Sequence, residues 1–449
     1  MKKRRQSSSL WIIKGYLAVI LIGTILLCMP FAANGEYGNF WQRLFTSWFT
    51  ATSATCVTGL VVQNTGVYWT LFGQIVILAM IQVGGLGFMV VIYLVATFLR
   101  KKITLHERKT LMQAQGFIGL SGIVSLVKKI FLFALMFETL GAAILTIRFI
   151  PLYGTAKGIY YSIFLSISAF CNAGFDPLGM ASLTAFTTDI LVNLTLIFLI
   201  ICGGLGFVVW DNIFKSKFKF KDFFLHTKIV LITTLSLLVV STGLFLLFEF
   251  RHAFKDLNIG QKFLASFFQA TTCRTAGFAA VDQAALTDPS ILLSSILMFI
   301  GGSSGSTAGG IKTTTFAVLV LTILSTTIRR PNITVGKRQL DTAITKHASA
   351  IFLFYLFMVS TAVLIILGIE SDNILIRFQD VLFEVTSAVG TTGLSVANTE
   401  VFSIFSQAIL IVLMFVGRLG ALSIIAAFRE KSESGKDLIK HPTEKILVG

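Results

Sequence analysis

Four segments decide the fold: SWFTATSATCVTGL (residues 47–60), SIFLSISAFCNAGF (162–175), ASFFQATTCRTAGF (265–278) and VLFEVTSAVGTTGL (381–394). They align without a gap on one glycine each, namely Gly59, Gly174, Gly277 and Gly393. Ten residues before each glycine stands a phenylalanine, and six before it stands a small hydroxyl residue: Ser53, Ser168, Thr271 and Ser387. Fixed recurrence of this kind indicates an internal fourfold repeat.

The composition indicates a membrane protein. Of the 449 residues, 55% are hydrophobic and only 13% are charged, far from the average of soluble domains. Apolar runs such as 71–99 and 226–250 are longer than ordinary buried helices. A soluble protein with an unusually large core is therefore excluded.

The net charge of +16 follows from topology rather than from a nucleic-acid partner. Of the 37 Lys and Arg residues, 27 flank apolar runs in five clusters, at 2–14, 100–129, 215–228, 329–346 and 429–445. The positive-inside rule assigns all five clusters to the cytoplasm. The sequence thus predicts a multi-pass membrane protein with both termini cytoplasmic.

Neighbouring basic clusters enclose the same order of elements: a long apolar helix, a short stretch ending in the glycine, and a second long helix. The short stretches have about a dozen residues, whereas a spanning helix needs roughly 20, so they can only dip in and return. The predicted fold is an all-α integral membrane protein of four M1-P-M2 repeats, with eight transmembrane helices and four re-entrant pore helices around one pseudo-fourfold pore. The predicted repeats are 10–99, 126–214, 226–328 and 347–428, joined by cytoplasmic linkers 100–125, 215–225 and 329–346, with cytoplasmic ends 1–9 and 429–449.

The second helices share a glycine run 24 to 29 residues after the loop glycine, at 84–87, 203–206, 301–302 and 417–420. Small residues let helix backbones approach closely. A dinucleotide site is excluded, because no strand precedes these runs.

The four glycine loops have the chemistry of a cation filter. An ion can leave water only if oxygen ligands replace its hydration shell, and rings of backbone carbonyls do this. Glycine permits the backbone angles of such a loop, and the pore-helix C-termini favour a cation. The alternative is four duplicated hairpins that merely pack. The candidate ion-binding residues, through their backbones, are Val57, Thr58, Gly59, Asn172, Ala173, Gly174, Thr275, Ala276, Gly277, Thr391, Thr392 and Gly393.

Repeat three alone contains a Gly/Ser-rich stretch with little helix propensity inside an apolar helix. We expect it to break the helix below the filter and to act as a gate; a kinked packing surface is the alternative. The candidate gating residues of the intramembrane loop 301–312 are Gly301, Gly302, Ser303, Ser304, Gly305, Ser306, Thr307, Ala308, Gly309, Gly310 and Lys312.

Further charged residues fall within the apolar segments. Arg418 lies mid-helix in repeat four, where it could repel cations or hold the loop through its carbonyls; a structural ion pair is the alternative. Arg274, three residues before Gly277, is predicted to form a buried ion pair with Glu384 that supports the filter. Glu138 is a rival partner for Arg274.

The segments TCVTGL, FCNAGF, TCRTAGF and VGTTGL, with the loop STAGGIK and the helix segment VGRLG, resemble the membrane subunit of bacterial Ktr-type potassium transporters in the Trk/Ktr/HKT superfamily. The resemblance covers about residues 10–449. It implies a homodimer in which each protomer has its own pore, a gating role for the Gly-rich loop and the fourth-repeat arginine, and a separate cytosolic RCK-type ring that binds the regulatory nucleotide. In that superfamily, glycine in all four loops accompanies potassium, whereas serine in the first loop accompanies sodium preference in some plant relatives.

Other function classes fit less well. A protease would need a base near Ser304 or Ser306, but all five histidines fall near helix ends or in flanking segments, so no enzyme is expected. No strand followed by a glycine loop follows residue 428, so no organic cofactor is expected in this chain. A sodium-selective or sodium-coupled transporter on the same pore, or a sodium dependence of potassium uptake, remains the alternative.

Overall fold

The computed structural model describes residues 8–34, 39–98, 123–179, 182–329, 333–335 and 338–420. Several segments of the predicted organisation lie outside the described residues. They are residues 1–7 of the N-terminus, most of the 100–125 linker, parts of the 329–346 linker, and everything after Gly420, including the end of repeat four and the 429–449 tail.

Each repeat begins with a long apolar helix: α1 (Ser8–Leu27), α7 (Ile123–Tyr153), α11 (Leu225–Glu249) and α15 (Thr342–Ile369). All four are long and apolar enough to cross a membrane. Their outward faces keep large apolar side chains exposed, for example Leu21, Leu132, Leu235 and Leu364. Such faces are typical of helices in contact with lipid.

A shorter helix follows in each repeat: α2 (Phe40–Cys56), α8 (Thr155–Cys171), α12 (Ile259–Thr272) and α16 (Phe378–Gly390). At about 1.5 Å per residue, these helices are too short to span the hydrocarbon. Their C-terminal halves are buried in the middle of the protein. They are the predicted re-entrant pore helices.

The second helices are broken more often than the sequence indicated. In repeat one, α4 (Leu71–Leu86) meets α5 (Phe88–Phe98) at 92°, and in repeat two, α9 (Ile190–Leu205) meets α10 (Phe207–Lys215) at 93°. The breaks fall at Gly87 (φ +88°) and Gly206 (φ +98°), where the left-handed backbone favours glycine.

Repeat three breaks near the same point, and the described helix of repeat four ends there. In repeat three, α13 (Asp288–Phe299) and α14 (Thr313–Thr327) are separated by the predicted loop. In repeat four, α17 (Ile404–Leu419) ends at Gly420, where φ is +79°. The expectation that repeat three alone is interrupted is wrong, because the final glycine of each other run ends a helix.

Hydrogen bonds fix the residue that precedes each second helix. In repeats one and two its side chain accepts from a free amide of the first turn, and in repeats three and four it donates to a glutamate. Thr70 and Asp189 cap α4 and α9 by accepting from the amides of Gly73 and Val192. In repeat three, Glu249 at the end of α11 accepts from the amide (2.9 Å) and hydroxyl (2.6 Å) of Thr287. In repeat four, Glu370 accepts from Ser403 in the same way. The Glu249 and Glu370 contacts tie the first helix of repeats three and four to the second helix.

Short elements complete the described chain. They are the helical turns η1 (Pro30–Ala32), α3 (Thr65–Tyr68), η2 (Ser182–Phe186), η3 (Phe220–Asp222), η4 (Gln283–Ala285) and η5 (Thr399–Val401), and a two-stranded antiparallel hairpin of β1 (Thr334–Val335) and β2 (Arg338–Gln339). The hairpin falls within the predicted 329–346 linker.

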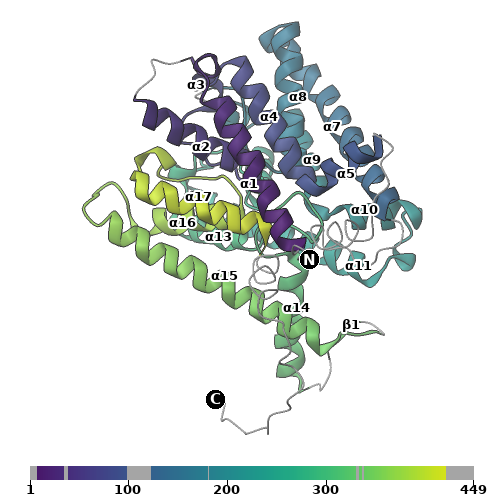
Figure 1. Ribbon diagram of the computed structural model, residues 1–449. Helices are drawn as coiled ribbons and strands as arrows, with labels where there is room; N and C mark the ends of the chain where they lie inside the picture. The colour runs from purple at the N-terminus through teal and green to yellow at the C-terminus, as the bar shows by residue number, and fades with distance from the viewer. Residues whose placement is uncertain are drawn as a thin grey trace, which may run out of the picture.

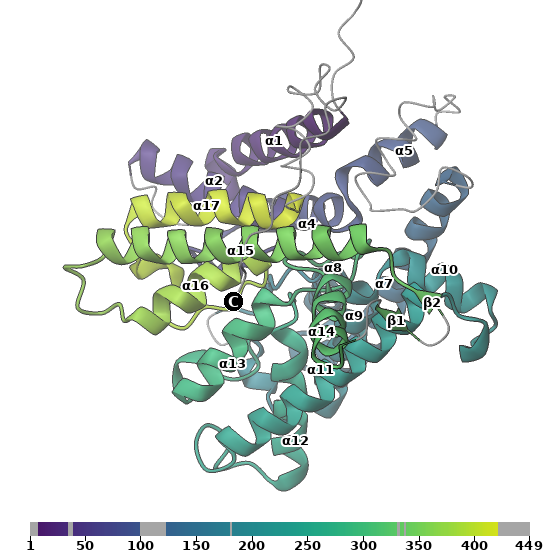
Figure 2. The ribbon, with the colours of Figure 1, turned by 90° about the horizontal axis from the view of Figure 1, so that it is seen from below.

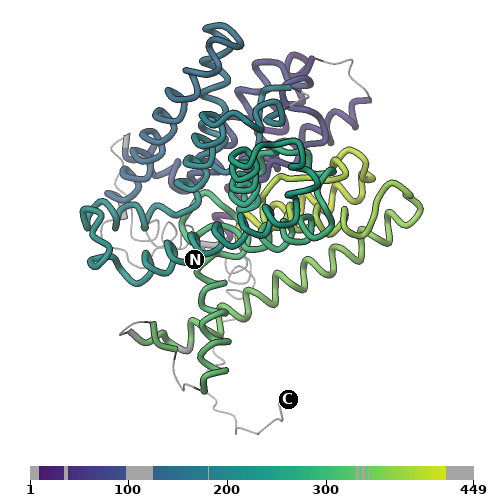
Figure 3. Tube along the Cα trace, turned by 180° about the vertical axis from the view of Figure 1, so that it is seen from behind, coloured from purple at the N-terminus to yellow at the C-terminus, as the bar shows by residue number. Residues whose placement is uncertain are grey.

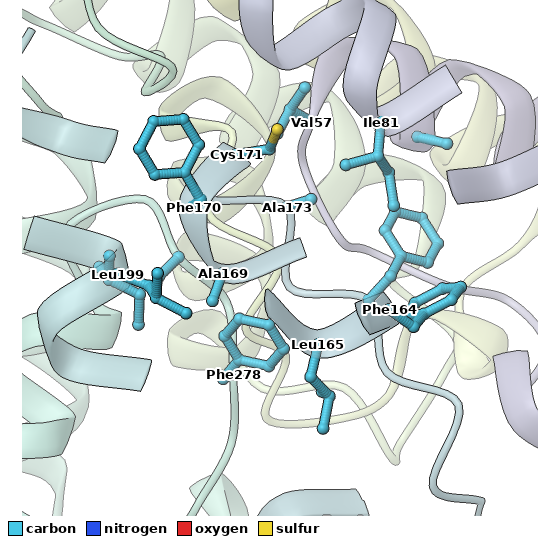
Figure 4. Close-up of a cluster of buried hydrophobic side chains, with 14 of the residues drawn as sticks. Val57, Ile81, Phe164, Leu165, Ala169, Phe170, Cys171, Ala173, Leu199 and Phe278 are labelled. Carbon is cyan, nitrogen blue, oxygen red and sulfur yellow. The ribbon is translucent and has the colours of Figure 1, made fainter. Parts of the chain in front are cut away.

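The four repeats follow one another around a common centre, as the colour sequence from purple to yellow shows in two perpendicular views (Figures 1 and 2). The view from behind shows the same order (Figure 3). The largest buried cluster joins neighbouring repeats: Val57 and Ile81 of repeat one, and Phe278 of repeat three, lie around Phe164 and Ala173 of repeat two (Figure 4). The repeats therefore share one interior.

Candidate ion pathway

The four glycine loops share a backbone conformation that the sequence did not predict. Two residues before each glycine, the backbone turns left-handed, at Val57 (φ +57°), Asn172 (+58°), Thr275 (+70°) and Thr391 (+52°). The glycines follow with φ of +94°, +70°, +80° and +92° in chain order. Left-handed backbone costs a non-glycine residue about 1–3 kcal/mol and is typical of functional sites. Three of the four residues are β-branched, for which this conformation is a true outlier.

The glycines form a closed ring with the carbonyls of the neighbouring loops. A Cβ added at Gly59 would lie 2.5 Å from the carbonyl oxygen of Ala173, and one at Gly174 would lie 2.9 Å from that of Ala276. A Cβ at Gly277 would lie 2.0 Å from the Thr392 oxygen. At Gly393 it would lie 2.2 Å from the Thr58 oxygen, which closes the ring. Each loop thus meets the next in chain order, and no side chain fits at any of the four glycines.

Hydroxyl groups at the ends of the pore helices hold these loops. Ser53 accepts from the amide of Gly59 (3.0 Å), and Ser387 accepts from that of Gly393 (3.0 Å). Ser168 instead donates to the Phe175 carbonyl (2.7 Å). Three of the four small hydroxyl residues of the repeat, Ser53, Ser168 and Ser387, therefore support the loop backbone.

The third pore helix departs by one residue from the gapless alignment. Its supporting hydroxyl is that of Thr272, which donates to the Phe278 carbonyl (2.7 Å), while Thr271 bonds within its own helix to Phe267. Likewise Phe268 is fully buried and Phe267 is half-buried. The alignment on the glycines places the loop correctly. The side chains of the third pore helix, however, are shifted by one residue relative to those of the other three pore helices.

The glycine runs of the second helices pack on the pore-helix ends. A Cβ at Gly84 would lie 2.0 Å from the Thr55 carbonyl oxygen, one at Gly203 would lie 1.9 Å from that of Phe170, and one at Gly417 would lie 2.2 Å from that of Val389. All three carbonyls stand four residues before a loop glycine. The predicted close backbone approach is confirmed.

The predicted break in the second helix of repeat three is present, and residues 300–312 form a non-helical loop between α13 and α14. Its backbone binds repeat two: the amides of Ser303 and Thr307 donate to the carbonyls of Gly204 (3.0 Å) and Gly203 (3.3 Å). The Thr307 hydroxyl donates to the Phe170 carbonyl (3.1 Å).

The far side of the loop touches repeat four. A Cβ at Gly309 would lie 2.1 Å from the Thr391 hydroxyl oxygen. Since Thr391 is the left-handed residue that follows the fourth pore helix, the loop 300–312 lies directly against the base of the glycine ring.

Two basic side chains donate hydrogen bonds to backbone carbonyls of this loop. Arg418 donates to the carbonyl of Thr307 and also to those of Gly84 and Gly85 in repeat one, the last at 3.2 Å. Lys312 donates to the Ala308 carbonyl (2.7 Å). Within the described ranges neither side chain forms an ion pair, so of the readings that the sequence left open for Arg418, hydrogen bonding to the loop is the one observed.

The predicted ion pair between Arg274 and Glu384 is wrong. Arg274 is buried and donates to the Thr234 hydroxyl of α11 (3.5 Å), whereas Glu384 accepts from Ser395 (2.7 Å) and from Thr399. The rival, Glu138, accepts from Gln82 at 3.0 and 3.1 Å.

The rotation of the third pore helix accounts for this difference. Arg274 comes directly after that helix, and its side chain points toward the first helix of its own repeat. Glu384 instead accepts hydrogen bonds from the loop that follows the fourth pore helix. The sequence held one signal of this offset, because the Thr-Cys pair stands one residue farther from the loop glycine in TCRTAG (272–277) than in TCVTG (55–59).

Comparisons with known proteins agree with this geometry. The family model described as TrkH, cation transport protein, matches residues 4–438. The chain is 37% identical to the Ktr system potassium uptake protein B of Bacillus subtilis, over 97% of this chain and 95% of that protein. It is 36% identical to the potassium/sodium uptake protein NtpJ of Enterococcus hirae, over 100% of this chain and 99% of that protein.

A solved structure has the same fold. The crystal structure of the potassium transporter TrkH from Vibrio parahaemolyticus matches with a TM-score of 0.71 at 19% identity, over 94% of this chain and 85% of that one.

Proposed function

The chain belongs to the TrkH family of cation transport proteins, and from that premise we propose that it carries potassium ions into the bacterial cell across the plasma membrane. The observation that carries this proposal is the closed ring of four glycine loops, each meeting a carbonyl of the next loop. The names of the full-length relatives, a potassium uptake protein and a potassium/sodium uptake protein, support the same class of cargo.

The proposed filter works through the backbone. Residues 57–59, 172–174, 275–277 and 391–393 would offer carbonyl oxygens that replace the water shell of the ion. The C-terminal ends of the four pore helices reach the same centre, and each contributes about half a negative charge there. Neither the backbone carbonyls nor the helix ends require an acidic side chain in the ion path.

We propose that the intramembrane loop and Arg418 form the gate. The loop lies against the base of the fourth filter loop and is held by hydrogen bonds from repeats two and four. Moving it would require these bonds to break together, which suits a structure with two discrete positions.

The regulatory partner is proposed to be a separate chain. The family resemblance implies a cytosolic RCK-type ring that binds the nucleotide, and a homodimer of the membrane subunit with cytoplasmic termini. The printed name "Ktr system" of the Bacillus subtilis relative supports an assembly of more than one component.

A sodium-selective or sodium-coupled transporter is the second candidate, because the relative from Enterococcus hirae is named for both ions. Ion flux into liposomes that contain the purified chain separates the two. Potassium and rubidium flux well above sodium flux supports a potassium filter. Sodium flux equal to potassium flux would contradict it, and a potassium flux that requires added sodium would indicate coupling.

A further inference from the structure

A short segment after α10 exposes aromatic rings between lysines. Residues 214–224 read FKSKFKFKDFF, and we call them the Phe/Lys turn. Phe218, Phe220 and Phe224 are 66%, 51% and 61% exposed. Large apolar rings grouped on a surface mark an interaction site more often than isolated ones do.

The turn is held in one conformation. Lys217 (φ +48°) and Phe218 (φ +61°) are successive left-handed residues, which is unusual for side chains of this size. The amide of Phe218 donates to the Ile213 carbonyl (3.1 Å), and that of Phe224 donates to the side chain of Asn212 (3.0 Å). The backbone therefore keeps Phe218 outside the core instead of allowing it to fold inward.

The base of the turn is fastened to a spanning helix. Asp211 of α10 forms ion pairs with Lys129 of α7 and with Lys215, both at 2.6 Å. The ring of Phe214 stacks on Phe133 of α7 with centroids 5.2 Å apart. The position of the turn is therefore set by the bundle itself.

The direction of α10 carries the turn away from the path of the preceding apolar helix. The axes of α9 and α10 meet at 93°, so α10 does not continue the direction of α9. Both views show α10 at the margin of the molecule, on the side away from α2, α16 and α17 (Figures 1 and 2). A basic segment at the margin of a membrane protein, next to the end of an apolar helix, can reach the headgroups of the bilayer.

The charge of the turn is almost entirely positive. It contains Lys215, Lys217, Lys219 and Lys221 but only one acidic residue, Asp222. In the part of the chain that the structure describes, Lys217, Lys219 and Lys221 make no ion pair. The basic groups are therefore available for an external anion.

We propose that the Phe/Lys turn binds anionic phospholipid headgroups of the cytoplasmic leaflet, with the phenylalanine rings among the acyl chains and the lysines at the phosphates. Basic residues next to a membrane helix are attracted by anionic lipid, and aromatic side chains anchor at the interface. An acidic protein surface would be a partner for the lysines but not for the phenylalanine rings. The rim position and three phenylalanines without a polar group favour lipid.

A depth measurement tests the proposal independently of transport. Phe218→Cys carries a spin label in a Cys28→Ser background, since the other four native cysteines are buried. The label's accessibility to oxygen and to a water-soluble nickel complex is compared in vesicles of phosphatidylcholine, with and without phosphatidylglycerol. We expect phosphatidylglycerol to raise the oxygen-to-nickel ratio several-fold, and the triple change Lys217→Gln, Lys219→Gln, Lys221→Gln to abolish the rise.

Two further variants keep the result decisive. Phe224→Cys repeats the measurement at a residue without left-handed backbone, in case Phe218→Cys does not fold. Lys255→Cys, in an exposed segment of the opposite side, should report water in both lipids. An equal ratio in both lipids, a rise that survives the triple change, or protection that appears only with the cytosolic regulatory subunit would each overturn the proposal.

Discussion

Arg418 of the fourth repeat donates a hydrogen bond to the backbone carbonyl of Thr307, in the loop that interrupts the third repeat. The same guanidinium reaches the carbonyls of Gly84 and Gly85 in repeat one, and Thr307 itself binds Gly203 and Phe170 in repeat two. One side chain and one loop residue therefore connect all four repeats directly below the glycine ring.

Replacing Arg418 with Gln should raise basal potassium flux. Hydrogen bonds from a charged group are worth about 1.5–3 kcal/mol, so the loop equilibrium should shift by roughly ten- to a hundredfold. Rubidium flux into liposomes measures the change. Arg418→Lys is the matched control: it keeps the charge but loses the planar fork of donors. If charge repulsion alone closes the pore, Lys should leave the flux low, whereas release by Lys supports the hydrogen bonds.

Deleting residues 303–310 should leave a more open pore with higher flux, because it removes the backbone that lies against Thr391. Thr307→Val should give a smaller rise, since it removes only the hydroxyl bond to Phe170. Flux is compared on protein that elutes as a single species from size-exclusion chromatography. Unchanged flux in a correctly assembled deletion variant would contradict the gate.

The four glycines of the proposed filter should differ in their tolerance of alanine. The added Cβ would lie nearest to a neighbouring carbonyl at Gly277 (2.0 Å) and Gly393 (2.2 Å), and farthest at Gly174 (2.9 Å). We therefore expect potassium selectivity over sodium to fall most at Gly277 and Gly393 and least at Gly174. Gly243→Ala and Gly260→Ala are controls, because their Cβ would meet nothing within 4 Å. Equal losses at all four sites would argue against this steric account.

Arg274 and Glu384 should behave as independent sites. Because each has its own partners, a double-mutant cycle of Arg274→Gln and Glu384→Gln should show coupling below about 0.5 kcal/mol. Glu384→Gln and Ser395→Ala, which share a 2.7 Å hydrogen bond, should couple more strongly. Thermal unfolding in detergent measures both cycles. Strong coupling between Arg274 and Glu384 would restore the ion pair that the sequence suggested.

Thr272→Val should destabilise the protein more than Thr271→Val does. The first change leaves the Phe278 carbonyl without its hydroxyl donor, a loss of about 1–3 kcal/mol for a buried group. The second removes a bond within one helix. Thermal unfolding should therefore show a clearly larger decrease for Thr272→Val, and the reverse order would reject the one-residue rotation of the third pore helix.

The sequence by itself determined the repeat, the membrane class and the position of the four loops. These depend on local quantities: the length of an apolar run, the distance between basic clusters, and a glycine at a fixed place. The break at 301–312 was likewise visible, because glycine and serine lower helix propensity over a whole stretch.

The tertiary structure alone decided how these parts meet. The left-handed backbone at Val57 and Thr391, the breaks at Gly87 and Gly206, and the contact of Arg274 with Thr234 all arise where separate segments of the chain pack together. A local pattern does not contain those contacts, since a β-branched residue or a helical glycine adopts its unusual backbone only when several neighbours hold it there.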